Sequence, residues 1–258
     1  MCTRYITPED REIEAIWAID RKTNRRNDWK NLLQVFPLSG AAFIRRARDA
    51  TEYEREMVFG QWGMIPPWSP THIPQAKQTK EQREKDQPGK RLSTVNSRTD
   101  RMEKSFTFRN AWKRGQRCII PASSFDEPNW ETGKNVWWRF RRADAKPWGL
   151  AGLWDVWKDP QTGEEWDSYT MLTINANLHP LMSRMHKIEI DRKTGQEIFD
   201  KRSVVPLEEH NFDRWLTCTV DEARQMLELP SADLMAAGPA GPAGEGGAPE
   251  AEEETAEA

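Results

Sequence analysis

Hydrophobic residues along the chain form short runs separated by turn residues, and only a few of them recur at helical spacing. The runs rich in β-branched and aromatic residues predict strands at 41–46, 52–62, 117–121, 136–141, 149–157 and 169–175. A hairpin is predicted over 188–199, around a turn at 193–195. Helices are predicted from Thr7, which precedes a proline and two acids, and at 106–113, 179–185, 206–216 and 221–227. Many short strands with few helices favour an α+β fold in one domain.

Composition separates the end of the chain from the rest. Residues 231–258 are rich in Ala, Gly, Pro and Glu and carry seven acidic side chains and no basic one. Such a composition predicts a disordered tail after a folded domain at 1–230. Without the tail, the formal net charge changes from −3 to +4. The folded body is therefore mildly basic, which permits an anionic partner without requiring one.

Several classes of protein find no support in the sequence. No apolar run approaches the roughly 18 residues of a membrane span, and the N-terminus lacks the apolar stretch of a secretory signal. The three cysteines are odd in number and far apart, which argues against a disulfide framework and for a reducing cytoplasm. No Cys-x-x-Cys pair or His-Glu-x-x-His motif occurs, so neither a metal nor an organic cofactor is predicted. Most of the 13 tryptophans are expected in the core.

Cys2 is the most unusual candidate for chemistry. Removal of Met1 would place a free α-amine and a thiol on one residue, with ordinary pKa values of about 8 and 8.5. A 1,2-aminothiol reacts with an aldehyde in two steps: the amine forms a Schiff base, and the thiol then closes a thiazolidine ring. Taken alone, a cysteine at position 2 is more typical of an unstructured terminus.

Three other segments carry candidate polar groups. Asn96 and Arg98 are two residues apart in an extended segment, so both side chains can face one ligand, and a guanidinium suits phosphate. Glu127 follows an apolar strand, at the rim of a cleft, and becomes a general acid or base if burial raises its pKa. Cys118, within that strand, is interpreted as core. His179 and His186 compete as the neutral-pH proton carrier, and spacing does not decide between them.

Taken in order, these segments resemble the SOS response-associated peptidase (SRAP) family, whose members crosslink to abasic sites in single-stranded DNA. Each motif is weak alone, but the ordered set from residue 2 to about 216 is specific. The start resembles the family's Met-Cys-Gly-Arg-Tyr, and Asn96 to Asp100 resembles its Asn-Ala-Arg-Ser-Glu. Further matches lie at Phe36-Pro37, Trp62 to Trp68, Arg117 to Glu127, Ala151 to Trp154, Pro180 to His186, Lys201 to Leu207 and Arg214 to Leu216.

The resemblance implies a strand-rich, barrel-like core with short flanking helices, and a covalent mechanism. Cys2, freed of Met1, is expected to attack the C1′ aldehyde of an abasic sugar and to end as a thiazolidine crosslink that shields the lesion during the DNA damage response. Asn96 is expected to position the α-amine or the ring, and Glu127 to move protons. His186 is expected to help open the sugar or to bind the 3′ phosphate.

The resemblance also implies a surface for single-stranded DNA. Arg98 is expected to grip the phosphates that flank the lesion, and Arg4 and Arg109 to extend the basic track. The residues expected to pack on bases, wedge the duplex or shape the cleft are Pro37, Trp62, Pro66, Trp68 and Phe108. The protein is then predicted to be a cytoplasmic monomer that associates with the nucleoid when it is bound to DNA.

The sequence departs from the family pattern at three places. Thr3 replaces a glycine, Pro128 and Asn129 stand where the family has a tryptophan, and 187–200 is an insertion before Arg202. A rival alignment puts Met182 at the histidine position, but Pro180 to Met182 and Arg202 to Leu207 fit the assignment of His186. Two other functions stay open: a cysteine peptidase, whose substrate could be its own leading residue, and a non-covalent module that binds single-stranded DNA. For the crosslinking protein itself, peptidase and lyase activities also stay open.

Overall fold

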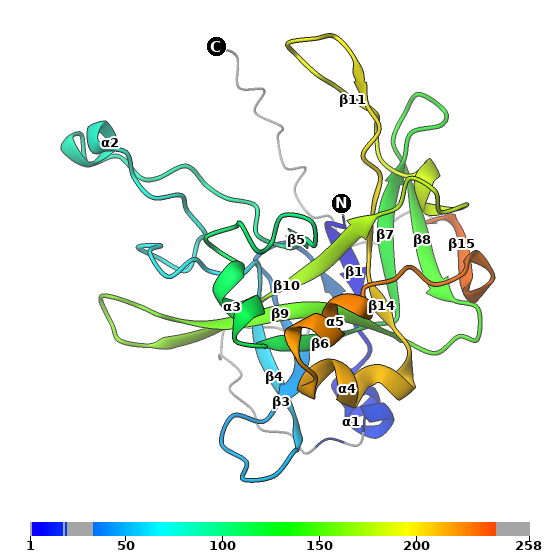
Figure 1. Cartoon of the computed structure of the whole chain (residues 1–258), viewed down its shortest axis with the longest axis horizontal. Helices are drawn as coiled ribbons and strands as arrows, with labels where there is room; N and C mark the ends of the chain where they lie inside the picture. The colour runs from blue at the N-terminus through cyan, green and yellow to red at the C-terminus, as the bar shows by residue number, and fades with distance from the viewer. Residues whose placement is uncertain (1, 18, 20–32, 241–258) are drawn as a thin grey trace.

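The computed structural model describes residues 2–17, 19 and 33–240 of the chain. A barrel is built from β3 (Gly40–Arg46), β4 (Arg55–Trp62), β6 (Arg117–Ala122), β9 (Trp148–Lys158) and β10 (Glu165–Asn175). In order around the barrel, β3 pairs with β4, β4 with β10, β10 with β9, β9 with β6, and β6 with β3 (Figure 1). Of these pairings only β4–β10 is parallel. The predicted strand-rich α+β fold with a barrel-like core is confirmed.

Both faces of the barrel strands are buried, which explains why these strands read as continuous apolar runs. Along β3, Phe43 belongs to one hydrophobic cluster, with Tyr169, whereas Ile44 belongs to a second cluster, with Trp112 and Trp215. Successive side chains of a strand point to opposite faces, so each strand contributes to both clusters. A strand that is buried on both faces loses the alternation of polar and apolar residues.

A second sheet holds the N-terminal strand against the strand that carries Glu127. Its order is β2 (Gln34–Val35), β1 (Arg4–Ile6), β7 (Ser124–Asn129), β8 (Val136–Arg142) and β15 (Met235–Pro239). Arg4 lies opposite Asp126, and Glu127 lies opposite Trp138. The sequence placed Glu127 at the rim of a cleft after an apolar strand, whereas it lies within a second, buried strand. The chain turns at Ser123, whose N–H donates to the Ile6 carbonyl, and continues as a buried strand beside β1.

The folded part extends past the predicted boundary at residue 230. The sequence predicts a disordered tail from Ser231, whereas Ala232–Leu234 form the short 3₁₀ helix η3 and β15 pairs with β8 up to Pro239. This part of the prediction is wrong because the backbone edge of β8 supplies hydrogen-bond partners to a segment of low strand propensity. The rest of the predicted tail, 241–258, and Met1 lie outside the described residues.

Short helices lie between the strands in the chain, and one of them begins later than predicted. The sequence predicts a helix from Pro206, but Pro206 and Leu207 form β14 (Pro206–Leu207), which pairs with β9. The helices are α1 (Asp10–Trp17), α2 (Lys80–Glu84), α3 (Arg109–Lys113), α4 (Phe212–Thr217) and α5 (Val220–Gln225), with 3₁₀ turns η1 (Met182–Arg184) and η2 (Glu209–Asn211). In the described part of the chain, no helix has the length and apolar character needed to cross a membrane.

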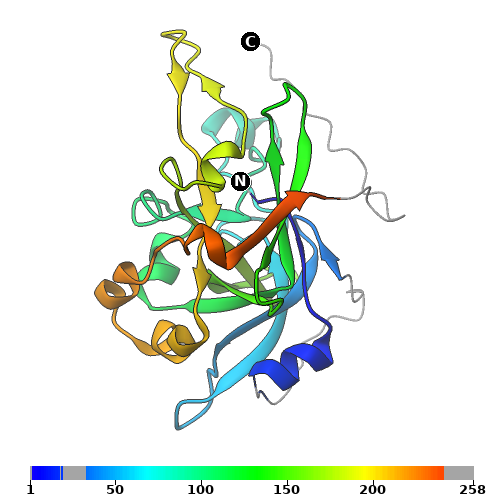
Figure 2. The ribbon, with the colours of Figure 1, turned by 90° about the vertical axis from the view of Figure 1, so that its right-hand side faces the viewer.

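Short strands and one hairpin complete the described chain. Strands β5 (Asn96–Arg98) and β13 (Arg202–Val204) both pair with β10. The predicted hairpin is confirmed as β11 (Glu189–Ile190) and β12 (Glu197–Ile198). This hairpin protrudes from the body on the same side as the ends of β7 and β8 (Figures 1 and 2).

Candidate active site

Four polar residues that are far apart in the sequence come together around the start of β1. The Asn96 side chain, at the start of β5, donates from Nδ2 to the backbone carbonyl of Cys2 at 2.6 Å. His186, just after η1, places its Nε2 3.4 Å from the Glu127 carboxylate of β7. The charge of Glu127 in turn raises the pKa of the Cys2 thiol. The structure therefore brings together Cys2, Asn96, Glu127 and His186, the four residues that the sequence singled out.

Glu127 lies in an environment that favours its protonated form. Its side chain is fully buried, and burial raises its pKa from 4.5 to about 7, to which the neighbouring Asp126 contributes. A carboxyl group with such a pKa gives up and takes up a proton with similar ease at neutral pH. Sequence reasoning anticipated a raised pKa as a condition for the role of this residue, and the structure supplies the burial that causes it.

The backbone and the ring of His186 are both held in place. Its φ of 61° is in the left-handed region, and its N–H donates to the Pro128 carbonyl at 2.6 Å. Nε2 lies 3.0 Å from the Arg202 carbonyl, which only accepts, so Nε2 carries a proton. Burial lowers the pKa of His186 to about 3. The 3.4 Å contact with Glu127 is therefore not an ion pair at neutral pH, because His186 is uncharged.

His179, the competing histidine, caps a turn instead. Its Nδ1 accepts from the N–H groups of Leu181 and Met182 at 3.2 and 3.1 Å, and its Nε2 lies 2.9 Å from the Pro230 carbonyl. Met182, which the rival alignment would put at the histidine position, is fully buried in the hydrophobic core. The geometry therefore favours His186 as the histidine of the site.

The Cys2 side chain has no exposed surface in a chain that still carries Met1. Its thiol donates to the Arg4 carbonyl at 3.3 Å. Burial, and then the nearby charge of Glu127, raise the pKa of the Cys2 thiol well above its ordinary value. The sulfur is therefore a neutral thiol at physiological pH, and it is less open to solvent than the sequence led us to expect.

Asp126 fastens the strands beneath the site. The fully buried carboxylate accepts from Arg139 Nε and Nη2 at 2.8 and 2.9 Å and lies 2.7 Å from Arg4 Nε. The Arg4 guanidinium also lies 4.9 Å from the centre of the Trp137 ring. A buried carboxylate between two guanidinium groups ties β1, β7 and β8 together, since removal of the carboxylate would leave both guanidinium groups without their acid. Asp126 had no functional signal in the sequence.

The residues expected to contact DNA differ in how much of their surface is exposed to solvent. Trp62 is fully buried, with its Nε1 donating to the Val95 carbonyl, so its ring is not available to a base and that expectation is corrected. Pro66 is also buried, Trp68 is half-buried and donates to the Gln75 carbonyl, and Pro37 is exposed. Trp62 instead packs edge-on against Tyr5, with ring centres 5.1 Å apart, which is a core role.

Basic and aromatic residues gather at the start of α3, and of Phe106, Phe108 and Arg109 only Phe106 is exposed. Arg109 stacks over the ring of Phe106 at 4.4 Å, and Phe106 is 62% exposed, whereas Phe108 is half-buried. Phe106 was not singled out from the sequence, because an aromatic residue in a short helix is typical of a core position. Arg98, the expected phosphate ligand, is bound by Asp100 and Asp200.

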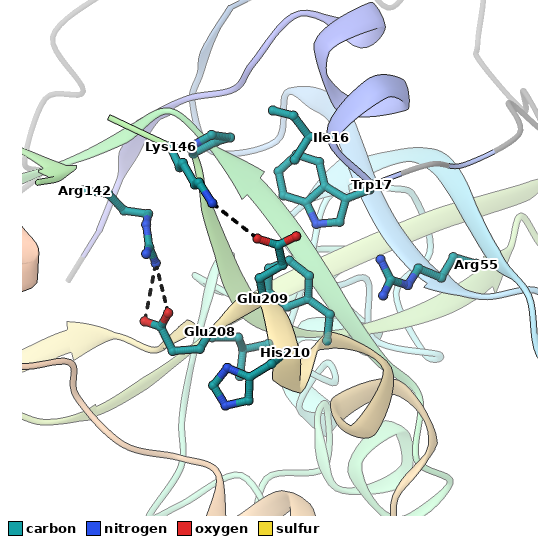
Figure 3. Close-up of a pocket in the computed structure, with 11 residues that line it drawn as sticks. Ile16, Trp17, Arg55, Arg142, Lys146, Glu208, Glu209 and His210 are labelled. Atoms are coloured by element: carbon teal, nitrogen blue, oxygen red, sulfur yellow. Dashed lines mark hydrogen bonds and ion pairs between the residues drawn. The ribbon is translucent and has the colours of Figure 1, made fainter. Parts of the chain in front are cut away.

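A cavity of about 680 Å³ lies apart from these residues (Figure 3). Its apolar wall includes Ile16, Trp17 and Phe212, and the ion pairs Arg142–Glu208 and Lys146–Glu209 cross its rim. Its cations are therefore matched by acids, and none of the four converging residues lines it. Within residues 2–17, 19 and 33–240, no group of three or more His, Cys, Asp or Glu side chains is arranged to hold a metal ion.

The buried Glu127 predicts an unusual dependence of stability on pH. Because its folded-state pKa of about 7 lies above the ordinary 4.5, its contribution is most favourable below pH 4.5 and is lost as the pH rises through 7. The loss amounts to about 3 kcal/mol above pH 7. We therefore compare the free energy of unfolding of Glu127→Gln with that of the wild type, by urea unfolding at pH 5 and at pH 8. The difference should shift in favour of Glu127→Gln as the pH rises from 5 to 8. A difference that is the same at both pH values would contradict the burial of a titrating carboxyl group.

The comparisons with a family model and with solved structures agree with one another. The model of the family described as SOS response associated peptidase (SRAP) matches residues 1–240. A crystal structure of a protein from Bordetella bronchiseptica is similar, with a TM-score of 0.71 and 34% identity, over 93% of this chain and 99% of that one. A protein from Bacteroides thetaiotaomicron shares the fold, with a TM-score of 0.66 and 19% identity, over 92% of this chain and 90% of that one.

Two curated relatives have names that describe an activity. The abasic site processing protein HMCES of Xenopus tropicalis is 26% identical over 147 residues, which are 50% of this chain and 40% of the relative. The protein of the same name from Gallus gallus is 26% identical over 163 residues, which are 54% of this chain and 44% of the relative. The match thus spans less than half the length of these relatives.

Proposed function

Because the chain belongs to the SOS response associated peptidase (SRAP) family, we propose that it processes abasic sites in single-stranded DNA through a covalent thiazolidine crosslink at Cys2. One observation carries the proposal: the start of the chain is held by Asn96 beside a Glu127 with a pKa near 7 and a neutral His186. The names of the HMCES relatives support abasic sites as the substrate.

The proposed reaction joins an aldehyde to an aminothiol and releases one water molecule. The α-amine of Cys2 adds to C1′ of the opened sugar, and the proton that leaves nitrogen ends on oxygen, which gives a carbinolamine. Loss of that hydroxyl as water, with a proton supplied by Glu127, gives the protonated imine, which keeps its N–H. The Cys2 sulfur then bonds to the imine carbon, and the electron pair of the C=N bond returns to the nitrogen. Glu127 accepts the thiol proton in this last step and so returns to its starting state.

The electrostatics of the site favour this order of events. The raised pKa of the Cys2 thiol keeps the sulfur protonated, so the amine is the better first nucleophile. Asn96 Oδ1 is buried and has no hydrogen-bond partner among the described residues, which makes it a suitable acceptor for an N–H of Cys2. His186 is uncharged, and the donation of its Nε2 proton to the Arg202 carbonyl holds the ring beside Glu127.

Removal of Met1 is the first requirement of the proposal. While Met1 is present, the nitrogen of Cys2 is an amide and cannot form a Schiff base. The full burial of Cys2 in that chain means that processing must also open the thiol to the DNA. Intact-mass measurement of the purified protein tests this requirement directly. We expect the mass of the chain without Met1.

The decisive experiment mixes the protein with a single-stranded oligonucleotide that carries one abasic site, made by excision of uracil. We expect a covalent species on a denaturing gel with this oligonucleotide and none with the same oligonucleotide before excision. Peptide mapping should place the added mass on residue 2. Binding of equal strength to both oligonucleotides, with no covalent species, would refute the crosslinking function and favour a non-covalent binding module.

The geometry gives less support to a cysteine peptidase. A peptidase of this type uses a thiolate nucleophile, which is normally favoured by a lowered pKa. Here burial and Glu127 raise the pKa of the Cys2 thiol, and the nearby His186 is held neutral through a ring nitrogen that donates to the Arg202 carbonyl. The amine of Cys2 is therefore the group that this site activates.

A further inference from the structure

Two arginines beside the candidate active site are joined by two carboxylates into a closed network. Arg98 Nη1 lies 2.6 Å from Asp200 Oδ2, and Arg98 Nη2 lies 3.0 Å from Asp100 Oδ2. Arg202 completes the network, with Nε 2.8 Å from Asp200 Oδ1 and Nη1 2.9 Å from Asp100 Oδ1. Each carboxylate therefore bridges both guanidinium groups, and the four charges cancel.

Both guanidinium groups belong to residues that are tied to the site. Arg98 is two residues after Asn96 in β5, and the backbone carbonyl of Arg202 holds the ring of His186. The network is also close to solvent, because the side chain of Arg98 is 23% exposed and that of Asp200 is 27% exposed. An anion that enters the site would therefore meet two converging guanidinium groups that are already occupied.

The two carboxylates come from different parts of the fold. Asp100 lies in the turn after β5, two residues from Arg98, and the preceding Thr99 N–H donates to the Thr173 carbonyl of β10. Asp200 instead lies two residues after β12, at the base of the protruding β11–β12 hairpin (Figure 2). It belongs to 187–200, the insertion relative to the family pattern. Asn177 binds both neighbours of Asp200, the Phe199 carbonyl and the Lys201 N–H, so Asp200 leaves the arginines by rotation of its side chain and not by movement of the backbone.

We propose that the Asp200 carboxylate occupies the place of a DNA phosphate between Arg98 and Arg202 and competes with the phosphodiester backbone for these two arginines. The inference rests on the proposed function, because it assumes that single-stranded DNA enters this site. A carboxylate and a phosphate both present oxygens to the two N–H groups of a guanidinium, so one can replace the other. The hairpin thus lowers the affinity of the protein for undamaged strands, which carry phosphates but no aldehyde.

Binding of undamaged single-stranded DNA tests the competition. We expect Asp200→Asn to raise the affinity for an undamaged oligonucleotide by about fivefold at low salt, because the arginines lose one competing charge. The dependence of binding on salt should become steeper, by about 0.7 in the slope of log K against log salt for each additional phosphate bound. Fluorescence anisotropy across a salt titration measures both quantities.

Asp191→Asn is the matched control. Asp191 lies in the same hairpin, and its carboxylate accepts from the N–H groups of Lys193 and Thr194 in the turn, away from the arginines. The two variants change the net charge equally, so any general effect of charge appears in both. We expect Asp191→Asn to bind undamaged strands nearly as the wild type does.

Each remaining outcome decides against the inference. The melting temperature then tells a loss of DNA binding apart from a loss of fold stability. An affinity of Asp200→Asn that equals that of Asp191→Asn would overturn the competition. A weaker affinity together with a lower melting temperature would show that Asp200 only braces the fold. If the wild type forms the covalent adduct but Asp200→Asn binds no better, the inference fails alone. If neither the wild type nor Asp200→Asn binds or crosslinks DNA, the proposed function fails with it.

Discussion

Cys2→Ala is expected to abolish the covalent adduct with abasic single-stranded DNA, because alanine keeps the α-amine but has no sulfur to close the ring. Cys2→Ser should separate the two chemical steps. Its amine can still form an imine at C1′, but a hydroxyl group is a much weaker nucleophile than a thiol for ring closure. We therefore expect an adduct of Cys2→Ser only after reduction with borohydride, as seen on a denaturing gel.

Cys218→Ala is the matched control for the loss of sulfur. Cys218 is a half-buried free cysteine that lies against Arg117, on the helical side of the barrel. Its replacement should leave the adduct and its rate unchanged. An adduct that survives in Cys2→Ala without reduction and disappears in Cys218→Ala would assign the reaction to the wrong cysteine and would end the proposal.

Glu127→Gln is expected to slow crosslinking at pH 7 by about 100-fold or more, the usual size of general acid–base catalysis. Glutamine preserves the shape of the side chain but neither supplies nor accepts the proton. In the wild type, the fraction of protonated Glu127 falls as the pH rises through about 7. The loss of water from the carbinolamine needs the Glu127 proton, so the rate of this step should fall as the protonated fraction falls. The rate profile of the wild type should therefore bend near pH 7, and that of Glu127→Gln should not.

Glu131→Gln provides the comparison for this change. Glu131 is an exposed carboxylate just beyond β7, where it pairs with Arg184 at 2.8 Å. Its pKa is lowered, with the Arg184 hydrogen bond as the main cause, so it holds no proton to give at neutral pH. Single-turnover rates of both variants between pH 5 and 9 measure the effect. Equal rates for the two variants, or a bend near pH 7 that persists in Glu127→Gln, would remove Glu127 from the mechanism.

Local sequence patterns were enough to locate the candidate reacting groups and most of the local structure. Apolar runs located the barrel strands, because a strand buried on both faces must be apolar throughout. The ordered motifs pointed to Cys2, Asn96, Glu127 and His186 before any coordinates, since chemistry requires particular side chains. Local patterns failed where pairing with a distant strand determined the conformation. The segments at Ser124–Asn129 and Met235–Pro239 are strands because β1 and β8 lie beside them.

Which of these groups meet, and in what protonation state, depends on contacts between distant parts of the chain. Spacing left His179 and His186 equal, but only His186 lies beside Glu127. The pKa of Glu127 follows from burial between strands that are far apart in the sequence, and so does the loss of Trp62 as a base-stacking surface. The pairing of Arg98 with Asp200 joins residues 102 positions apart. Burial and charge pairing are properties of the folded arrangement, because each depends on residues that no local window of sequence contains.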